Sequence, residues 1–204
     1  MTKAKNVAIF ISGRGSNMEA LMHNCKDDPL INFCLVFSNN ASAQGLEIAQ
    51  NFGVETKAFN KKEFESADAF DDAIIALLRE KEIDLVCLAG YMAIVSAKVI
   101  HAFPNKIINI HPSLLPSFPG LNVQQKAIDY GVKVAGCTVH FIDEKVDHGP
   151  IITQKSVEVN HNDTQETLTE KILVQEHKIY SEALKLFCHD KLEIIDRIVH
   201  VNNI

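Results

Sequence analysis

The first half of the chain alternates short apolar runs with segments whose apolar residues recur at helical spacing. The apolar runs predict buried strands, because a strand covered on both faces shows no polar alternation. In the amphipathic segment 67–81, Ser66 can cap the first turn, and the core-facing residues are Phe70, Ile74, Leu77 and Leu78. The predicted strands are 6–11, 31–38, 54–59, 85–88 and 106–110, and the predicted helices are 17–25, 43–51, 67–81 and 96–102.

The second half has a different pattern. Segments 134–142 and 151–159 flank the turn-rich stretch 143–150, which predicts an antiparallel hairpin with a long loop. A last strand is predicted over 192–200. The stretch 163–188 is a long amphipathic helix, with Leu168, Ile172, Ile179, Ala183 and Phe187 on one face.

Strands that alternate with helices predict an α/β fold, an open, mostly parallel twisted sheet with helices on both faces. The antiparallel hairpin belongs to the C-terminal half. A length of 204 residues, without a repeat, a low-complexity run or a linker, predicts a single domain over 1–204.

Composition and charge argue against several classes of function. Twenty basic against 26 acidic residues give a net charge of −6, which argues against nucleic acid as a partner. The longest uncharged apolar stretch, 85–97, is too short to span a bilayer, and the run 7–11 is too short for a signal peptide. Five cysteines without a CxxC pair indicate reduced thiols and a cytoplasmic protein. The composition suits a monomer or a homodimer.

The turn Ser12–Asn17 (SGRGSN) lies between the first predicted strand and helix, where free N–H groups and the positive helix end favour a phosphate. It lacks the dinucleotide fingerprint, because Met18 occupies the third glycine position and the second strand ends in Ser38-Asn39-Asn40 rather than an acid. A monophosphate site is favoured over a turn without a ligand and over an NAD site.

Asn109 and His111 are two apart on a predicted strand, so both side chains point to one side at its carboxyl end. An amide and a protonated imidazole side by side can stabilise a developing oxyanion. The following segment 112–116 (PSLLP) is stiff and suits a rigid pocket wall. Taken alone, a histidine at a strand end is more often structural.

Asp147 lies in the loop 143–150, where an acidic residue is usually solvated. Next to His111, however, its carboxylate would favour the charged imidazole and help to move a proton. Four residues are possible metal ligands, but no metal-binding spacing accompanies them, so no metal is predicted: His111, His140, Asp147 and His148. No nucleophile motif is present, and the run 175–177 is interpreted as a solvated helix face.

These residues also carry a resemblance. The segments ISGRGSN, VFSNN, LAGYM, NIHPSLLPSFPG, GCTVHFIDEKVDHGPIITQ and QEHKIY together resemble the phosphoribosylglycinamide formyltransferase family over nearly the whole chain. The resemblance implies a Rossmann-like formyltransferase. Its reaction would transfer the formyl group of the co-substrate 10-formyltetrahydrofolate directly to the amine of phosphoribosylglycinamide (GAR), in purine biosynthesis and without an acyl-enzyme.

The resemblance also implies roles for residues. The catalytic trio would be Asn109, His111 and Asp147, with Asp147 keeping His111 charged and oriented. A phosphate-binding half, about 1–105, would precede a folate-binding and catalytic half, about 106–204. The residues implied for GAR are Gly15, Ser16, Asn17 and Glu176. Those implied for the folate are Met92, Ala93, Ile94, Val95, Asn109, Asp143, Glu144, Lys145, Val146 and Asp147.

Two departures from the family concern the folate's glutamate tail. Ala93 and Ala67 stand where the family carries arginines, and Lys61, Lys62 or Lys98 are possible substitutes. The alternative function is a 10-formyltetrahydrofolate hydrolase, which usually has an extra N-terminal domain, whereas the first strand begins here near residue 6. A methionyl-tRNA formyltransferase would need an RNA-binding domain and a more basic chain. The missing dinucleotide fingerprint argues against an NAD-dependent oxidoreductase. A non-catalytic nucleotide-binding module would not need the catalytic trio.

Overall fold

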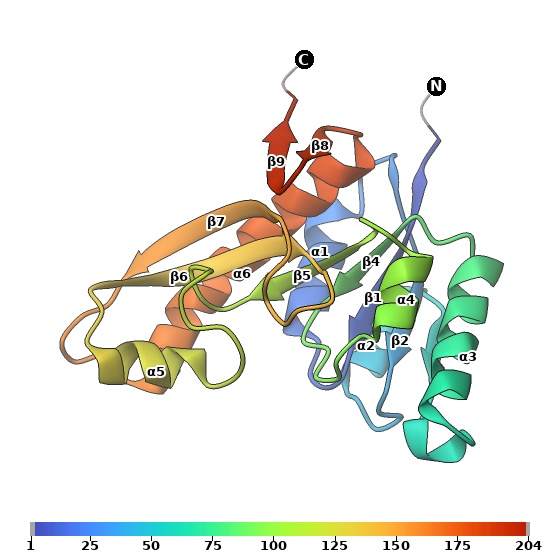
Figure 1. Cartoon of the computed structure of the whole chain (residues 1–204), viewed down its shortest axis with the longest axis horizontal. Helices are drawn as coiled ribbons and strands as arrows, with labels where there is room; N and C mark the ends of the chain where they lie inside the picture. Colours follow the sequence, from blue (N-terminus) through green and yellow to red (C-terminus); the bar gives the residue numbers. More distant parts are fainter. Residues whose placement is uncertain (1–2, 203–204) are drawn as a thin grey trace. The chain divides into compact units, whose positions relative to one another are not determined.

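The computed structural model describes residues 3–202 (Figure 1). The elements of the N-terminal part are β1 (Lys5–Ile11), α1 (Ser16–Cys25), β2 (Ile31–Ser38), α2 (Gly45–Asn51), β3 (Thr56–Ala58), the 3₁₀ turn η1 (Lys61–Glu63), α3 (Ala67–Glu80), β4 (Leu85–Leu88) and α4 (Ala97–Ala102). They are followed by β5 (Ile107–His111), α5 (Val123–Tyr130), β6 (Val134–Phe141), β7 (Ile151–Glu158), α6 (Gln165–Cys188), β8 (Leu192–Ile195) and β9 (Ile198–Val201).

Seven of the strands form one sheet in the order β3-β2-β1-β4-β5-β6-β7. The strand β1 pairs in parallel with β2 and β4, while β6 and β7 pair antiparallel. The order reverses direction after β3, and right-handed crossovers therefore place α1 and α2 on one face of the sheet and α3 on the other. The structure confirms the predicted α/β fold with its C-terminal hairpin.

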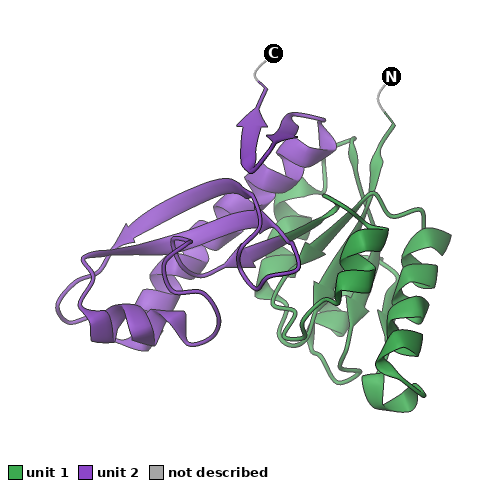
Figure 2. Ribbon diagram, in the orientation of Figure 1, with its two compact units in different colours: residues 1–108 green, residues 109–204 purple. Residues whose placement is uncertain are grey.

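The chain divides into two compact units, residues 1–108 and 109–204 (Figure 2). The first unit holds the parallel strands β1–β4, and β1 is buried over its last five residues. In the second unit, α6 packs against the β6–β7 hairpin, and β9 packs against β7. The boundary falls within β5, so the carboxyl end of this strand, with Asn109 and His111, belongs to the second unit.

Local sequence explains where the two longest helices begin. The Ser66 hydroxyl accepts a hydrogen bond from the N–H of Ala69 at the start of α3, as predicted. At the start of α6, Thr164 and Thr167 form a reciprocal capping box. The core-facing residues predicted for α3 are all buried, whereas Phe187, predicted for the core face of α6, is half-buried.

Three expectations for the secondary structure are corrected. The predicted strand 192–200 is the separate hairpin β8–β9, turned at Asp196, whose φ of 55° breaks an extended run. The predicted strand 54–59 shortens to β3, and η1 follows it. The helix α5 was not predicted, because it is only eight residues long and begins after a left-handed Asn122 rather than a capping side chain.

Candidate active site

The strand β5 brings two polar side chains to its carboxyl end. Asn109 is half-buried and His111 is buried, with apolar neighbours on the strand. This edge is where open α/β sheets bind their ligands. Both residues contact groups from the β6–β7 hairpin, so the structure brings them into one cluster, as the strand pattern predicted.

Both ring nitrogens of His111 face oxygen atoms. Its Nε2 lies 3.0 Å from the carbonyl oxygen of Phe118, and its Nδ1 lies 3.4 Å from Oδ2 of Asp147. A carbonyl oxygen can only accept, so Nε2 carries a hydrogen. If Nδ1 is protonated as well, the ring donates to both oxygens. The geometry therefore accommodates the imidazolium, with its charge next to a carboxylate.

Asp147 is held by a backbone hydrogen bond and is largely buried. The N–H of Gly120 donates to its Oδ2 over 2.8 Å, and its side chain is only 11% exposed. Its backbone is left-handed, with φ of 51°, a conformation that aspartate tolerates better than most residues. The usual interpretation of an acidic loop residue as solvated is therefore wrong here, because the loop folds its carboxylate inward onto His111.

His140 is the member of this cluster that sequence reasoning considered only as a metal ligand. It is 1% exposed, and its Nδ1 donates to the carbonyl oxygen of Phe141 over 2.8 Å. Burial is the main cause that holds the pKa of His140 below its usual value, so the ring is neutral and Nε2 is an acceptor. The amide nitrogen of Asn109 lies 3.3 Å from this Nε2.

The His140 contact fixes which end of the Asn109 amide is the nitrogen. One N–H of that nitrogen points to His140, and the second is left to donate elsewhere. The other neighbour of Nε2 is Oδ1 of Asp147, at 3.9 Å. A sequence signal for this role exists in retrospect. His140 alternates with Thr138 on an otherwise apolar strand, and both side chains are buried on β6.

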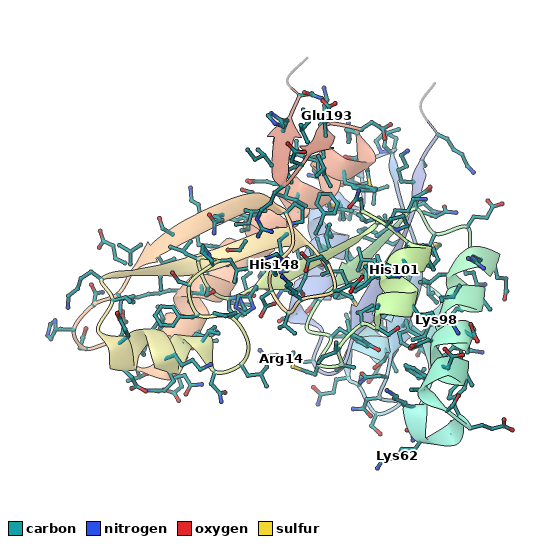
Figure 3. All side chains as sticks on the ribbon, in the orientation of Figure 1. Arg14, Lys62, Lys98, His101, His148 and Glu193 are labelled. Atoms are coloured by element: carbon teal, nitrogen blue, oxygen red, sulfur yellow. The ribbon has the colours of Figure 1, made fainter. Side chains whose placement is uncertain are left out.

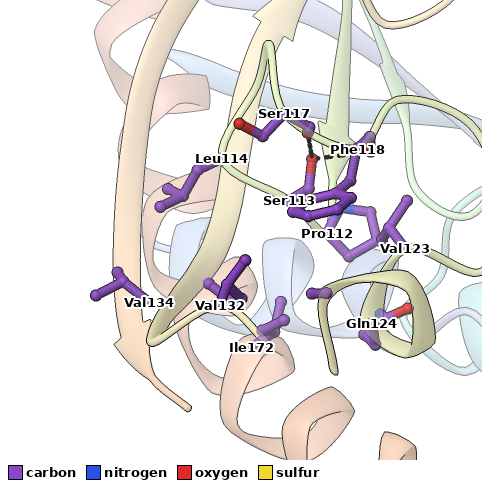
Figure 4. Close-up of a pocket in the computed structure, with 12 residues that line it drawn as sticks. Pro112, Ser113, Leu114, Ser117, Phe118, Val123, Gln124, Val132, Val134 and Ile172 are labelled. Atoms are coloured by element: carbon purple, nitrogen blue, oxygen red, sulfur yellow. Dashed lines mark hydrogen bonds between the residues drawn. The ribbon is translucent and has the colours of Figure 1, made fainter. Parts of the chain in front are cut away.

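The segment after His111 is anchored by its own hydrogen bonds. The Ser113 hydroxyl lies 2.6 Å from the carbonyl oxygen of Ser117 and 3.1 Å from that of Phe118 (Figure 4). The buried Thr138 hydroxyl donates to the Ser113 carbonyl and accepts from the N–H of Leu115. Beside this segment lies an apolar cavity of about 100 Å³, lined among others by Val123 and Ile172. The Phe118 carbonyl that holds His111 is thus itself held in place.

In the first unit, the predicted glycine turn precedes α1. Gly15 is the N-cap residue, with φ of 81°, and as a glycine it has no side chain to cap the helix. A Cβ on Gly15 would come within 3.0 Å of the Cα of Gly45, at the start of α2. Only glycine therefore fits at position 15, for both its conformation and its close neighbour. Ser16 and Asn17 begin the helix directly after it.

The segment 92–95 is tied to the same turn. The N–H of Met92 donates to the Ser12 hydroxyl over 2.8 Å, and that hydroxyl lies 2.6 Å from Oδ1 of Asn39. Met92 and Ile94 are 70% and 83% exposed. Of the three lysines proposed to replace the missing arginines, Lys98 is engaged by Asp68 and Asp72, at 2.8 and 2.7 Å.

Glu176 lies on the α6 face that packs against β6 and is buried, so its interpretation as part of a solvated face is wrong. Burial, followed by the negative charge of Glu176, raises the pKa of the Cys137 thiol to about 12. That thiol stays protonated near neutral pH and is no nucleophile. Within the loop 143–147, Glu144, Lys145 and Val146 are exposed, while Asp143 is half-buried.

Residues 3–202 contain no group of three or more histidine, cysteine, aspartate or glutamate side chains placed to hold a metal ion. No helix among them is long and apolar enough to cross a membrane. All five cysteines are free thiols.

Comparison with known proteins identifies the class. A profile of the formyl transferase family matches residues 5–184, so the chain belongs to the formyl transferase family. The phosphoribosylglycinamide formyltransferase of Bacillus subtilis is 43% identical over 182 residues, which cover 89% of this chain and 93% of that relative. The glycinamide ribonucleotide transformylase 1 structure from Symbiobacterium toebii has a TM-score of 0.95 at 45% identity, and covers 98% of this chain and 95% of that one. The resemblance predicted from the motifs is confirmed.

Some relatives are much longer than this chain. The trifunctional purine biosynthetic protein adenosine-3 of Bos taurus is 45% identical over 90% of this chain, which spans only 18% of that relative's length. A more distant structure is the formyltetrahydrofolate deformylase of Pseudomonas syringae. It has a TM-score of 0.89 at 26% identity, and the match covers 98% of this chain and 67% of that one.

Proposed function

We propose that this protein transfers the formyl group of 10-formyltetrahydrofolate to the amine of GAR, giving formyl-GAR and tetrahydrofolate. The observation that carries this proposal is the buried cluster at the end of β5, in which His111 lies between Asp147 and the Phe118 carbonyl and Asn109 is oriented by His140. The names and high identity of the relatives support the same substrates.

In the proposed reaction the neutral amine of GAR attacks the formyl carbon and forms a tetrahedral intermediate with a negatively charged oxygen. The second N–H of the Asn109 amide donates to this oxygen, and the protonated His111 stabilises it by its charge. Asp147 holds the imidazolium in place and supports the transfer of a proton from the attacking amine to N10 of the folate. The C–N bond to N10 then breaks, and tetrahydrofolate leaves with that proton.

The proposal also assigns residues to substrate binding. Gly15, Ser16 and Asn17 form the phosphate cradle at the start of α1, where the helix dipole favours an anion. Glu176 contacts GAR. The exposed apolar side chains of Met92 and Ile94, with Ala93 and Val95, are assigned to the folate. The loop 143–147 is assigned to the folate as well. The free thiols suit a cytoplasmic enzyme.

A second function uses the same trio. In a 10-formyltetrahydrofolate deformylase, water rather than an amine would attack the formyl carbon. The deformylase from Pseudomonas syringae supports this alternative at 26% identity, against 43% for the Bacillus subtilis transferase. The lower identity makes the deformylase the weaker candidate.

The test mixes the purified protein with 10-formyltetrahydrofolate and follows the release of tetrahydrofolate with and without GAR. We expect release only when GAR is present, with formyl-GAR as the second product. Release without GAR would make water the acceptor and favour the deformylase. No release under either condition, from protein that is shown to be folded, would contradict both functions.

A further inference from the structure

The loop between β6 and β7 carries Asp147, yet much of it is exposed. Its base is closed by a hydrogen bond from the N–H of Phe141 to the carbonyl oxygen of Pro150, over 2.9 Å. Gly149 packs so closely on Phe141 that a Cβ would lie 1.9 Å from the Phe141 carbonyl oxygen. These contacts fix the two ends of the loop. They leave open what holds its tip, where Lys145 and Val146 are solvent-exposed.

The loop tip is held in part by hydrogen bonds within the loop itself. The carboxylate of Asp143 accepts from the N–H of Lys145 over 3.0 Å and from Nδ1 of His148 over 2.7 Å. Burial opposes the charge of Asp143, but the hydrogen bonds from His148 and Lys145 and the charge of Arg197 together hold its pKa below the usual value. The two ends of the tip are thus joined through one carboxylate.

The C-terminal hairpin β8–β9 also holds the loop tip. Arg197 lies in the turn between β8 and β9, and its Nη2 donates a hydrogen bond to the carbonyl oxygen of His148. Its Nη1 lies 3.4 Å from Nδ1 of His148, whose hydrogen points to Asp143, so this contact is proximity rather than a hydrogen bond. The hairpin is itself held in place, because β9 packs on β7. Figure 3 shows His148 on the loop and Glu193 on the hairpin.

We propose that Arg197 is a positioning residue for Asp147: by binding the carbonyl of His148, the next residue along the chain, it holds the loop in the conformation that directs Asp147 at His111. The residue that it holds is adjacent to Asp147, so a freed His148 carbonyl lets the left-handed Asp147 backbone relax. The Asp147–His111 contact is already 3.4 Å long, and further loosening weakens it. The consequence for turnover rests on the proposed formyl transfer, whereas the consequence for the loop does not.

The first experiment measures how readily the loop between β6 and β7 opens, independently of catalysis. Arg197→Ala is compared with wild type and with Glu193→Ala, an exposed change on the same hairpin. The rate of cleavage after Lys145 by a lysine-specific protease, followed by mass spectrometry, reports opening of the loop. We expect cleavage about threefold to tenfold faster in Arg197→Ala, partial rescue in Arg197→Lys and no change in Glu193→Ala. The melting temperature should stay within about 2 °C, because exposed ion contacts add little to global stability. Unchanged cleavage would overturn the proposal.

The second experiment measures whether the loop acts through Asp147. In the formyl transfer assay, Arg197→Ala should lower kcat about threefold to tenfold and leave the KM for GAR unchanged. In an Asp147→Asn background the same change should lower kcat by less than about twofold, because the group that Arg197 positions is already inactive. Equal losses in the two backgrounds would overturn the role. If wild type shows no transfer, the proposed function fails, while the cleavage rates still decide whether Arg197 holds the loop.

Discussion

The two units offer candidate sites of different construction. In the first unit, the proposed phosphate cradle is made of backbone, at the helix start formed by Gly15, Ser16 and Asn17. In the second, the cluster around His111 is made of side chains from β5, β6 and the loop 143–150, and backbone groups of Phe118 and Gly120 hold it in place. A backbone site is damaged by an added atom, whereas a side-chain cluster is damaged by a lost or neutralised one. The predictions below exploit this difference.

The largest effect is expected in the side-chain cluster. Asp147→Asn keeps the size of the side chain and one oxygen for the Gly120 N–H, but removes the charge beside His111. We expect kcat for formyl transfer to fall on the order of 10²-fold or more, with thermal unfolding nearly unchanged. Steady-state kinetics and circular dichroism check this. A kcat close to wild type would remove Asp147 from the mechanism.

The matching change in the backbone site adds one methyl group. Gly15→Ala forces a left-handed alanine against the Cα of Gly45, so we expect the KM for GAR to rise about tenfold. The free energy of unfolding should fall by about 1–2 kcal/mol, the cost of a left-handed residue with a Cβ.

The control for this change is Gly13→Ala, because a Cβ on Gly13 meets nothing within 4 Å. Kinetics and urea unfolding of both variants should separate them clearly. An equal rise in the KM for GAR in the two variants would contradict the proposal that GAR binding depends on the close contact between Gly15 and Gly45.

A smaller effect is expected at the segment 92–95. Ala93→Arg, alone or with Ala67→Arg, introduces the arginines that the resemblance implies at these positions and should lower the KM for folates that bear glutamate tails, about threefold. The KM for a folate without the tail is the internal control and should not move. Equal KM values in variant and wild type for both folates would show that the tail is bound elsewhere or remains in solvent.

The smallest effect is on the pH dependence of stability. The folded pKa of His140 lies below the unfolded value, so His140 does not affect stability at a pH well above the unfolded value. As the pH falls through that value, about 6.5, the unfolded chain binds the proton first and stability is lost. His140→Gln removes this group and should make the acid side of the curve less steep, as measured by urea unfolding between about pH 5 and 8.

The exposed His200→Gln serves as the control for His140, and its curve should follow wild type more closely. A His140→Gln curve that coincides with wild type at every pH would contradict the neutral, buried state of His140. That result would also remove the basis for the orientation of the Asn109 amide.

Local patterns in the sequence determined most of the fold. Apolar runs marked β1, β2 and β4, and Ser66 marked the start of α3, because burial and capping depend on neighbouring residues. The glycine turn was predictable for the same reason, since its conformation is set within six residues. The pairing of Asn109 with His111 on one side of β5 follows from the period of a strand.

Tertiary structure alone decided the environment of each functional group. The N–H of Gly120 holds the carboxylate of Asp147, and the neutral state of His140 depends on its burial. The contact of Arg197 with His148 joins residues that are 49 apart in the chain. Sequence spacing carries no information about such distances, because a loop or a terminal hairpin can pack in many places. Solvent exclusion and hydrogen-bond partners, which set charge states, exist only once the chain has folded.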